Sequence, residues 1–378
     1  MSLENRRRLI RRLEELRQSK VIVYATSDRQ FAAAQMGDDM VRPFLDHLRA
    51  IGHTERLDLL IYSRGGAIDV PWRIVSALRQ TADEWNALIP FRANSGATLV
   101  ALGADKILFG RGGELGPIDP IMTVQNNGQQ EQINVEDVMA YVKFIQDKVN
   151  ITEQEALSTS LAKLADHLNP VLVGNVYRTH LHIRDVAKRV IGSRKNPPDQ
   201  AVLDAIVETL AAKVYAHGHA IGYRDAHAMG LPVEKAADET ETVMWDLLCE
   251  YEEQMKLRDP VDPAVCVATT DTYGEDVVLA VLESPDRLDE FGARLEVRAK
   301  RQVPPTLNVG LNFNLMLPGG APGGQPPMPQ QVLQQLLQQV QQQIGGQAQQ
   351  AVTQAIQQQA PLLGADVRMR GGKWARKA

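Results

Sequence analysis

Residues 57–109 twice repeat the order of apolar run, small-residue turn and amphipathic stretch. The first unit reads LDLLIY, then SRGG, then residues 67–80, whose apolar side chains share one helical face: Val70, Ile74, Val75 and Leu78. The second unit has an apolar run at 87–91, the turn ANSG at 93–96 and a helix-like stretch at 97–103, before a third run at 106–109. Buried strands that alternate with helices are typical of a parallel sheet. We therefore expect an α/β fold.

Charge and composition exclude several classes of protein. The 378 residues carry 41 Lys+Arg against 46 Asp+Glu, a net charge of −5, and 44% are apolar. These values argue against disorder throughout and against a nucleic acid partner. No window approaches the ~18 consecutive apolar residues of a membrane span, and the N-terminus lacks the apolar core of a secretory signal. Cys249 and Cys266 are too few for a disulfide framework, so we expect a cytoplasmic protein.

The chain divides by composition into five parts. Residues 1–20 predict a basic amphipathic helix that packs on the body and exposes its arginines, with membrane contact at most peripheral. Residues 21–258 form the main globular domain and 259–302 a small C-terminal extension. The prolines and glycines of 303–329 make a linker. Residues 330–378 are a Gln-rich helical or disordered tail with a basic end, which we expect to be solvated.

The tail has a pattern that suggests association. Residues 329–360 contain no charge and sixteen glutamines, with apolar residues at three-to-four spacing: Val332, Leu333, Leu336, Leu337, Val340 and Ile344. Glutamine tolerates a helix and leaves only this stripe to be buried. The pattern favours a homo-oligomer or a tail-mediated protein partner, although a disordered Gln-rich tail fits it equally well.

Ser95 has the local setting that acyl transfer requires. A serine in a tight turn directly before a helix holds its hydroxyl near outward-pointing N–H groups that favour negative charge. The N–H of Gly96 and one from the Gly65-Gly66 turn could bracket a tetrahedral oxyanion. Glycine lets the backbone approach a substrate without a Cβ. The alternative is that Ser95 is only the N-cap of the helix.

Three motifs in order resemble a known family. LDLLIYSRGG, IPFRANSGATLVALGADKI and GGELGPIDP are similar to the serine dehydrogenase proteinase family, relatives of signal peptide peptidase A and the Clp protease proteolytic subunit, over about residues 21–255. The resemblance implies a Clp/crotonase-type superhelix of repeated β-β-α units with a C-terminal helical extension. It implies a serine peptidase that acts on peptides or proteins, with Ser95 as nucleophile and Gly66 and Gly96 as the oxyanion hole. The Gly65-Gly66 turn would also hold the substrate backbone.

The general base is the open part of the site. Where the Clp subunit has its catalytic histidine this chain has Asp119, a poor base that we expect to shape the turn, and the next histidine is His167, at a helix end. Signal peptide peptidase A uses a lysine several dozen residues after the serine, which suggests Lys143 or Lys148. Both lie on a predicted helix at 135–149, on opposite flanks of its apolar face, and we favour Lys143 for its spacing from Ser95. A non-catalytic oligomeric scaffold on the same fold is the alternative function.

No metal or cofactor is expected. The pairs His180/His182 and His217/His219 lie in helix-like segments, where positions i and i+2 point about 200° apart and cannot chelate one ion. The run GRGGELG does not open a helix, as a dinucleotide fingerprint would.

Overall fold

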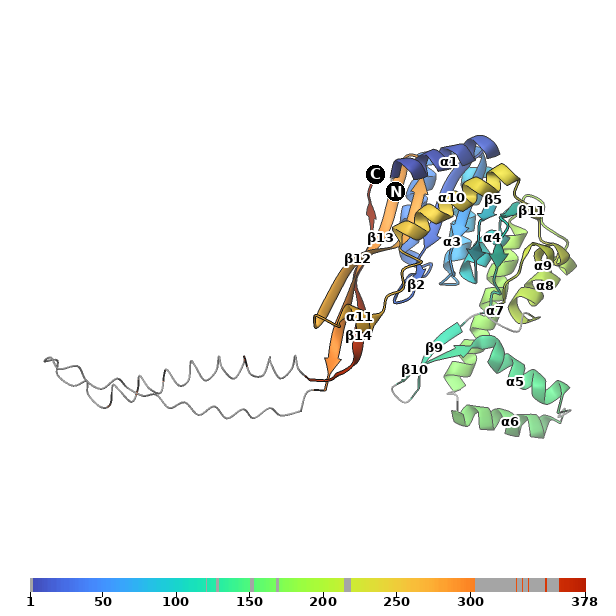
Figure 1. Ribbon diagram of the computed structural model, residues 1–378. Helices are drawn as coiled ribbons and strands as arrows, with labels where there is room; N and C mark the ends of the chain where they lie inside the picture. Colours follow the sequence, from blue (N-terminus) through green and yellow to red (C-terminus); the bar gives the residue numbers. More distant parts are fainter. Residues whose placement is uncertain are drawn as a thin grey trace. The chain divides into compact units, whose positions relative to one another are not determined.

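The computed structural model describes residues 3–119, 121–126, 129–149, 153–167, 170–213, 219–302 and 360–378, with single positions at 331, 335, 339 and 351 (Figure 1). Two compact units are present. Unit 1 comprises Met1–Pro260, Asp276–Arg294 and Arg370–Ala378, and unit 2 comprises Val261–Glu275 and Leu295–Met369. Composition divided the chain into five parts. In the structure, residues 276–294 and the basic end of the chain belong instead to the same compact unit as the main body.

An eight-stranded sheet organises the chain. Its order is β11 (Val233–Lys235), β7 (Lys106–Phe109), β5 (Ala82–Ile89), β4 (Thr54–Tyr62), β1 (Lys20–Thr26), β12 (Thr272–Ser284), β13 (Arg287–Arg301) and β14 (Leu362–Arg376). The five strands from β11 to β1 are parallel to their neighbours, and β12 is antiparallel to β1. The large, mostly parallel sheet confirms the expected α/β class.

Helices cover both faces of this sheet. On β4, Leu59 and Ile61 pack with α2 (Val41–Ile51), α3 (Val70–Thr81), α4 (Gly96–Leu102), α7 (Pro170–Gly192) and α8 (Gln200–Glu208). Leu60 and Tyr62 pack on the other face, with α1 (Leu3–Arg17) and α10 (Asp238–Gln254). Strands buried on both faces read as continuous apolar runs rather than alternating ones, which explains LDLLIY.

The predicted helix face at 67–80 is confirmed: Val70, Ile74, Val75 and Leu78 are all buried in α3. The remaining elements are short or lie outside the main sheet: β2 (Asp28–Arg29), β3 (Ala32–Ala33), η1 (Asp38–Met40), β6 (Arg92–Ala93), β8 (Glu114–Leu115), β9 (Ile121–Asn126), β10 (Gln129–Asn134), α5 (Val135–Asp147), α6 (Gln154–His167), the π-helical η2 (Thr209–Lys213), α9 (Tyr223–Ala228) and α11 (Pro263–Cys266).

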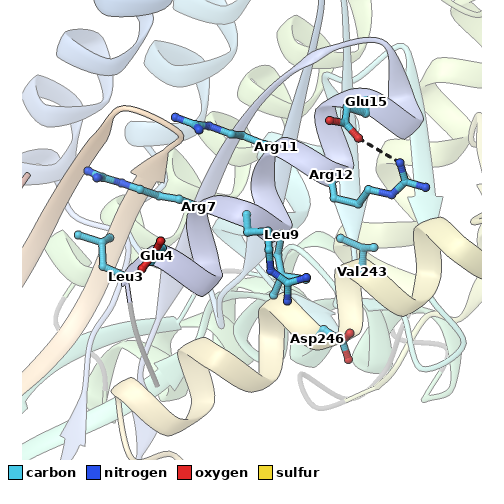
Figure 2. A pocket seen from close by; sticks show the side chains of 10 residues that line it. Leu3, Glu4, Arg7, Leu9, Arg11, Arg12, Glu15, Val243 and Asp246 are labelled. Carbon is cyan, nitrogen blue, oxygen red and sulfur yellow. Dashed lines mark hydrogen bonds and ion pairs between the residues drawn. The ribbon is translucent and has the colours of Figure 1, made fainter.

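Helix α1 packs on the body, but the expectation that it exposes its arginines is wrong for Arg6, which is buried. Its apolar residues Ile10 and Leu13 are fully buried, and its Arg6 forms a 2.7 Å ion pair with Glu283 of β12. A groove of about 1160 Å³ runs along α1 and α10. Figure 2 shows Arg7 and Arg11 pointing away from α10 at this groove. In the part of the chain that the structure describes, no helix is long and apolar enough to cross a membrane.

The basic end of the chain forms a strand that the sequence analysis did not predict. Within unit 1, Trp374 Nε1 donates a 3.0 Å hydrogen bond to Asp39 Oδ2, and its ring contacts Phe291. The backbone of Leu288 exchanges hydrogen bonds with Lys377 and Ala378. Within unit 2, Arg301 pairs with Asp271 at 2.8 Å and donates to the Ala360 carbonyl. The apolar stripe of residues 332–344 lies outside the described residues.

A buried histidine fastens α2 to the β12–β13 turn. His47 Nδ1 lies 2.9 Å from Ser284 Oγ, and His47 Nε2 lies 3.1 Å from Asp289 Oδ2. The order Ser-His-Asp is that of a hydrolase triad, but the residue after Ser284 is Pro285, which has no N–H to offer an oxyanion. Since the three residues are also buried, we assign them a structural role.

This histidine predicts a pH-dependent stability. Burial lowers the pKa of His47 to about 4, while Asp289 and Asp46 act to raise it and Arg287 to lower it further. Between pH 6.5 and 4 the unfolded chain binds a proton that the folded chain does not, so stability is full above pH 6.5 and falls as the pH drops through this window. The loss by pH 4.5 should be on the order of 2–3 kcal/mol.

Urea unfolding of wild type and His47→Gln at pH 7 and pH 4.5 measures this effect. The variant should lack this component of the pH dependence, whereas His53→Gln, which changes an exposed histidine, should retain it. Equal pH dependence in His47→Gln and wild type would contradict the assignment.

Candidate active site

The Gly65-Gly66 turn leaves β4 in a conformation that excludes side chains. Gly65 has φ +90° and Gly66 has φ +156°, in the range that L-residues rarely adopt. A Cβ on Gly66 would lie 2.3 Å from the carbonyl oxygen of Met36, and one on Gly65 would lie 2.4 Å from that of Asn94. The Met36 N–H donates to Gly65 O and the Ala67 N–H to Met36 O, so the turn is fixed from one side by the backbone.

Ser95 sits at the start of α4 in a strained backbone conformation. Its φ of +50° and ψ of −115° are unusual for a residue with a Cβ, and such strain costs of order 1–3 kcal/mol and clusters at functional sites. The side chain makes no capping hydrogen bond. The alternative that Ser95 serves as an ordinary N-cap therefore loses its physical basis.

The two turns touch each other. A Cβ on Gly65 would lie 2.9 Å from Ser95 Cβ, and one on Gly96 would lie 3.1 Å from the Gly66 nitrogen. Among the described residues, neither the Gly66 N–H nor the Gly96 N–H has a hydrogen-bond acceptor. Two unused donors thus lie side by side next to the Ser95 side chain.

Buried hydroxyl groups hold both turns in place. Ser63 Oγ accepts from the Gly65 N–H at 3.0 Å and from Thr26 Oγ1 at 2.9 Å. On the other side, Thr98 Oγ1 contacts the Ala93 carbonyl at 2.7 Å and the backbone of Gly116. Because these hydroxyls bond to backbone in or next to the turns, they fix the conformation of both turns.

A cavity of about 390 Å³ opens beside Ser95. Its lining comes from the Met36 segment, the two turns, α4 and α7: Gln35, Met36, Gly37, Arg64, Gly66, Ala67, Ile68, Ser95, Gly96, Leu99 and Ile183. The sequence analysis identified the serine and the glycines but not Ile183, whose helix lies far along the chain and carries no motif.

Among the described side chains, the candidate bases Lys143, Lys148 and Asp119 do not line this cavity. Lys143 on α5 and Lys148 just after it are both exposed, and neither lines the cavity. Asp119 is buried but also lies outside the lining, and His167 is the last residue of α6. The identity of the base stays a prediction.

His180 and His182 contact two different carboxylates. His180 and His182 both lie in α7, where His180 Nδ1 contacts Glu136 Oε1 and His182 Nε2 contacts Asp69 Oδ1, each at 2.8 Å. His217 lies outside the described residues. Over the described parts of the chain, no group of three His, Cys, Asp or Glu residues could hold an ion.

The His182–Asp69 pair was missed by the sequence analysis. Each residue directly adjoins one that lines the cavity, His182 next to Ile183 and Asp69 next to Ile68. The two positions are 113 residues apart, and only the packing of α7 against α3 brings them together.

A family model described as ClpP-like SDH-type serine proteinase matches residues 1–148. The match includes both turns of the site, and also Lys143 and Lys148. The resemblance inferred from the three motifs is confirmed.

Two uncharacterized proteins of Methanocaldococcus jannaschii are also similar. They are 31% identical over 104 residues and 33% identical over 123 residues, which is 28% and 30% of this chain. The matches cover 35% and 41% of those proteins, so this chain spans well under half the length of the curated relatives it matches.

Among solved structures, a serine-to-alanine variant of the 1510-N membrane-bound stomatin-specific protease aligns at 15% identity and a TM-score of 0.33, over 55% of this chain and 78% of that chain. A lysine-to-alanine variant of that protease in complex with a substrate peptide aligns at 14% identity and a TM-score of 0.23, over 56% and 93% of the two chains. Both similarities are low.

The strain at Ser95 can be measured with two variants that both lack the hydroxyl. Ser95→Gly relieves the unfavourable backbone conformation and Ser95→Ala keeps it, so the glycine variant should have a free energy of unfolding about 1 kcal/mol higher. At Ser76, an ordinary helical position in α3, the order should be reversed by about the same amount. Urea unfolding measures all four variants. A more stable alanine variant at position 95 would contradict the strain.

Proposed function

We propose that this protein is a serine peptidase with Ser95 as its nucleophile. One observation carries the proposal: a strained, uncapped serine lies beside two glycine amides without acceptors, at the wall of a cavity. The family match over residues 1–148 supports the same activity. Peptide or protein substrates follow from that activity.

The reaction would proceed through an acyl-enzyme. Ser95 Oγ attacks the peptide carbonyl carbon as its proton passes to the base, and the carbonyl electrons move onto oxygen. The Gly66 and Gly96 amides donate to this oxyanion, and loss of a donor of this kind costs about 10²–10³ in rate. When the tetrahedral intermediate collapses, its C–N bond breaks and the amine leaves with the proton that the base had taken. Water then hydrolyses the ester between Ser95 and the acyl group through the same steps.

We also propose the repeated β-β-α superhelix for the body. In support, β5 and β7 are each followed by a short strand, β6 and β8, and these two pair in parallel. Isolated bridges join Ser63 to Ala93 and Leu115 to Ile221, which extends this second layer. Assembly as a homo-oligomer, a partner for the tail and a cytoplasmic location remain proposals that rest on the sequence alone.

Ser95→Ala should abolish peptide hydrolysis, with a loss of at least about 10³-fold in kcat/KM, because it removes the attacking oxygen. Casein or a fluorogenic peptide library serves as substrate. A fluorophosphonate probe should label the wild type at Ser95 and leave Ser95→Ala unlabelled. Ser284→Ala, which changes the buried hydroxyl beside His47, should keep both hydrolysis and labelling. Unchanged hydrolysis by Ser95→Ala would overturn the assignment of Ser95 as the nucleophile.

For the base we propose a lysine, Lys143 before Lys148. Lys143→Ala should lower kcat by about 10²–10⁴-fold, with Lys148→Ala close to wild type. The His182→Gln variant is the matched control, because it removes a titratable group next to the cavity. A loss confined to His182→Gln would refute the lysine proposal.

The exposed position of both lysines favours a second candidate, a non-catalytic oligomeric scaffold. The two functions differ in two results, labelling and hydrolysis. The scaffold predicts no fluorophosphonate label on Ser95 and no hydrolysis, at any concentration of the protein.

A further inference from the structure

The cavity beside Ser95 has a mixed lining that contains one cationic side chain. Large apolar side chains line part of its wall, those of Met36, Ile68, Leu99 and Ile183, together with the polar Gln35 and Ser95. Among the residues that line it, all of which the structure describes, Arg64 alone carries a charge. A single guanidinium in such a lining favours ligands with a negative charge at one position, because a charged donor discriminates among ligands more sharply than apolar contact does.

The guanidinium of Arg64 forms a hydrogen bond at Nε, while its two terminal nitrogens have no partner among the described residues. Its Nε donates a 3.0 Å hydrogen bond to Asp28 Oδ2, on a carboxylate that is only 14% exposed. Asp28 is fixed in turn by Tyr62 Oη at 3.0 Å and by Arg92 Nη1 at 3.2 Å. Among the described residues, the two terminal nitrogens of Arg64 have no partner. The hydrogen bond at Nε therefore orients the guanidinium, and its two terminal nitrogens stay available to a ligand.

The neighbouring charges leave that end available. Asp28 is shared between Arg64 and Arg92, and Arg92 is further paired with Glu114 at 3.2 Å. Both carboxylates of this cluster, Asp28 and Glu114, thus form ion pairs with Arg92, and neither contacts the terminal nitrogens of Arg64. Paired terminal N–H groups match the geometry of a carboxylate, which they bind through two parallel hydrogen bonds.

The position of Arg64 in the chain sets where such a carboxylate would lie. Arg64 directly precedes Gly65-Gly66, and the Gly66 amide is one of the two proposed oxyanion donors. A group bound by Arg64 would lie within one or two residues of the bond to be cleaved, while the apolar part of the wall holds a neighbouring side chain.

We propose that Arg64 makes this site selective for peptides with an acidic residue flanking the scissile bond, next to an apolar residue. This inference rests on the proposed peptidase function. Arg64 acts on substrate choice, and Asp28 is its positioning residue.

The test uses binding, so that it does not depend on hydrolysis. Fluorescent peptides that differ only by Glu or Gln at one position, scanned over the two residues on each side of an apolar residue, are titrated into the full-length Ser95→Ala variant. At one position the Glu peptide should bind about tenfold more tightly than its Gln partner, as expected for a charged hydrogen bond. Adding Arg64→Gln should remove the difference, and adding Arg64→Glu should invert it in favour of a Lys peptide.

Arg73→Gln in the same background is the matched control, since Arg73 is an exposed arginine of α3 outside the cavity lining. It should keep the preference for Glu. Equal binding of every Glu and Gln pair, or a preference that survives Arg64→Gln, would overturn the proposal.

Hydrolysis by the protein with Ser95 intact is a separate readout. Where it occurs, the ratio of kcat/KM for the Glu and Gln peptides should show the same dependence on Arg64. Charge-selective binding without hydrolysis would refute the peptidase and leave the Arg64 site standing. Hydrolysis without a preference for Glu over Gln would refute the Arg64 proposal and leave the peptidase function standing.

Discussion

The close approach of two backbone turns is the constraint on which the rest of this structure depends. At the ends of β4 and β5/β6, the Gly65-Gly66 turn and the Ser95-Gly96 turn meet so closely that a Cβ on Gly65 would overlap the backbone of Asn94 and Gly96. Such contact is possible only where parallel strands end at one edge of a sheet, because their following turns then point the same way. The apolar body supplies the rigidity that keeps the turns there, and the buried hydroxyls of Ser63 and Thr98 set their final positions.

The strained backbone of Ser95 lies beside two amides, those of Gly66 and Gly96, that have no acceptor among the described residues. A helix N-terminus leaves its first N–H groups without partners, and an N-cap side chain normally satisfies one of them. Here the serine does not cap, which leaves its hydroxyl available. The Gly96 amide, at the first helical position, has no acceptor among the described residues. The cost is borne by the surrounding packing, since α4 is buried along its whole length.

The sequence predicted the parts of this site that depend on local chemistry. Gly65, Gly66, Ser95 and Gly96 were identifiable because turns need residues without bulk and a helix start needs a small polar residue. Long-range convergence had no such signal. Arg64 and Asp28 meet although they are 36 residues apart, and Ile183 reaches the cavity from a helix whose pattern only shows that it is amphipathic. The C-terminal strand was missed for a related reason: residues 362–376 are mostly exposed, so LLGADVRMRGGKWAR lacks the apolar run that marks a buried strand.

The position of β12 in the sheet has a consequence for how the chain folds during synthesis. Val23 of β1 pairs with Glu283 of β12, so the edge of β1 has no partner until most of the chain has left the ribosome. The parallel strands from β1 to β7 lie within the first third of the sequence and can assemble much earlier. An unpaired strand edge is a template for pairing with other chains, and long-range β pairing is slow to form. The helix α1, made before β1 and packed beside it, covers one face of that strand but not its open edge, so the nascent protein is exposed to misassembly at this edge until β12 is made.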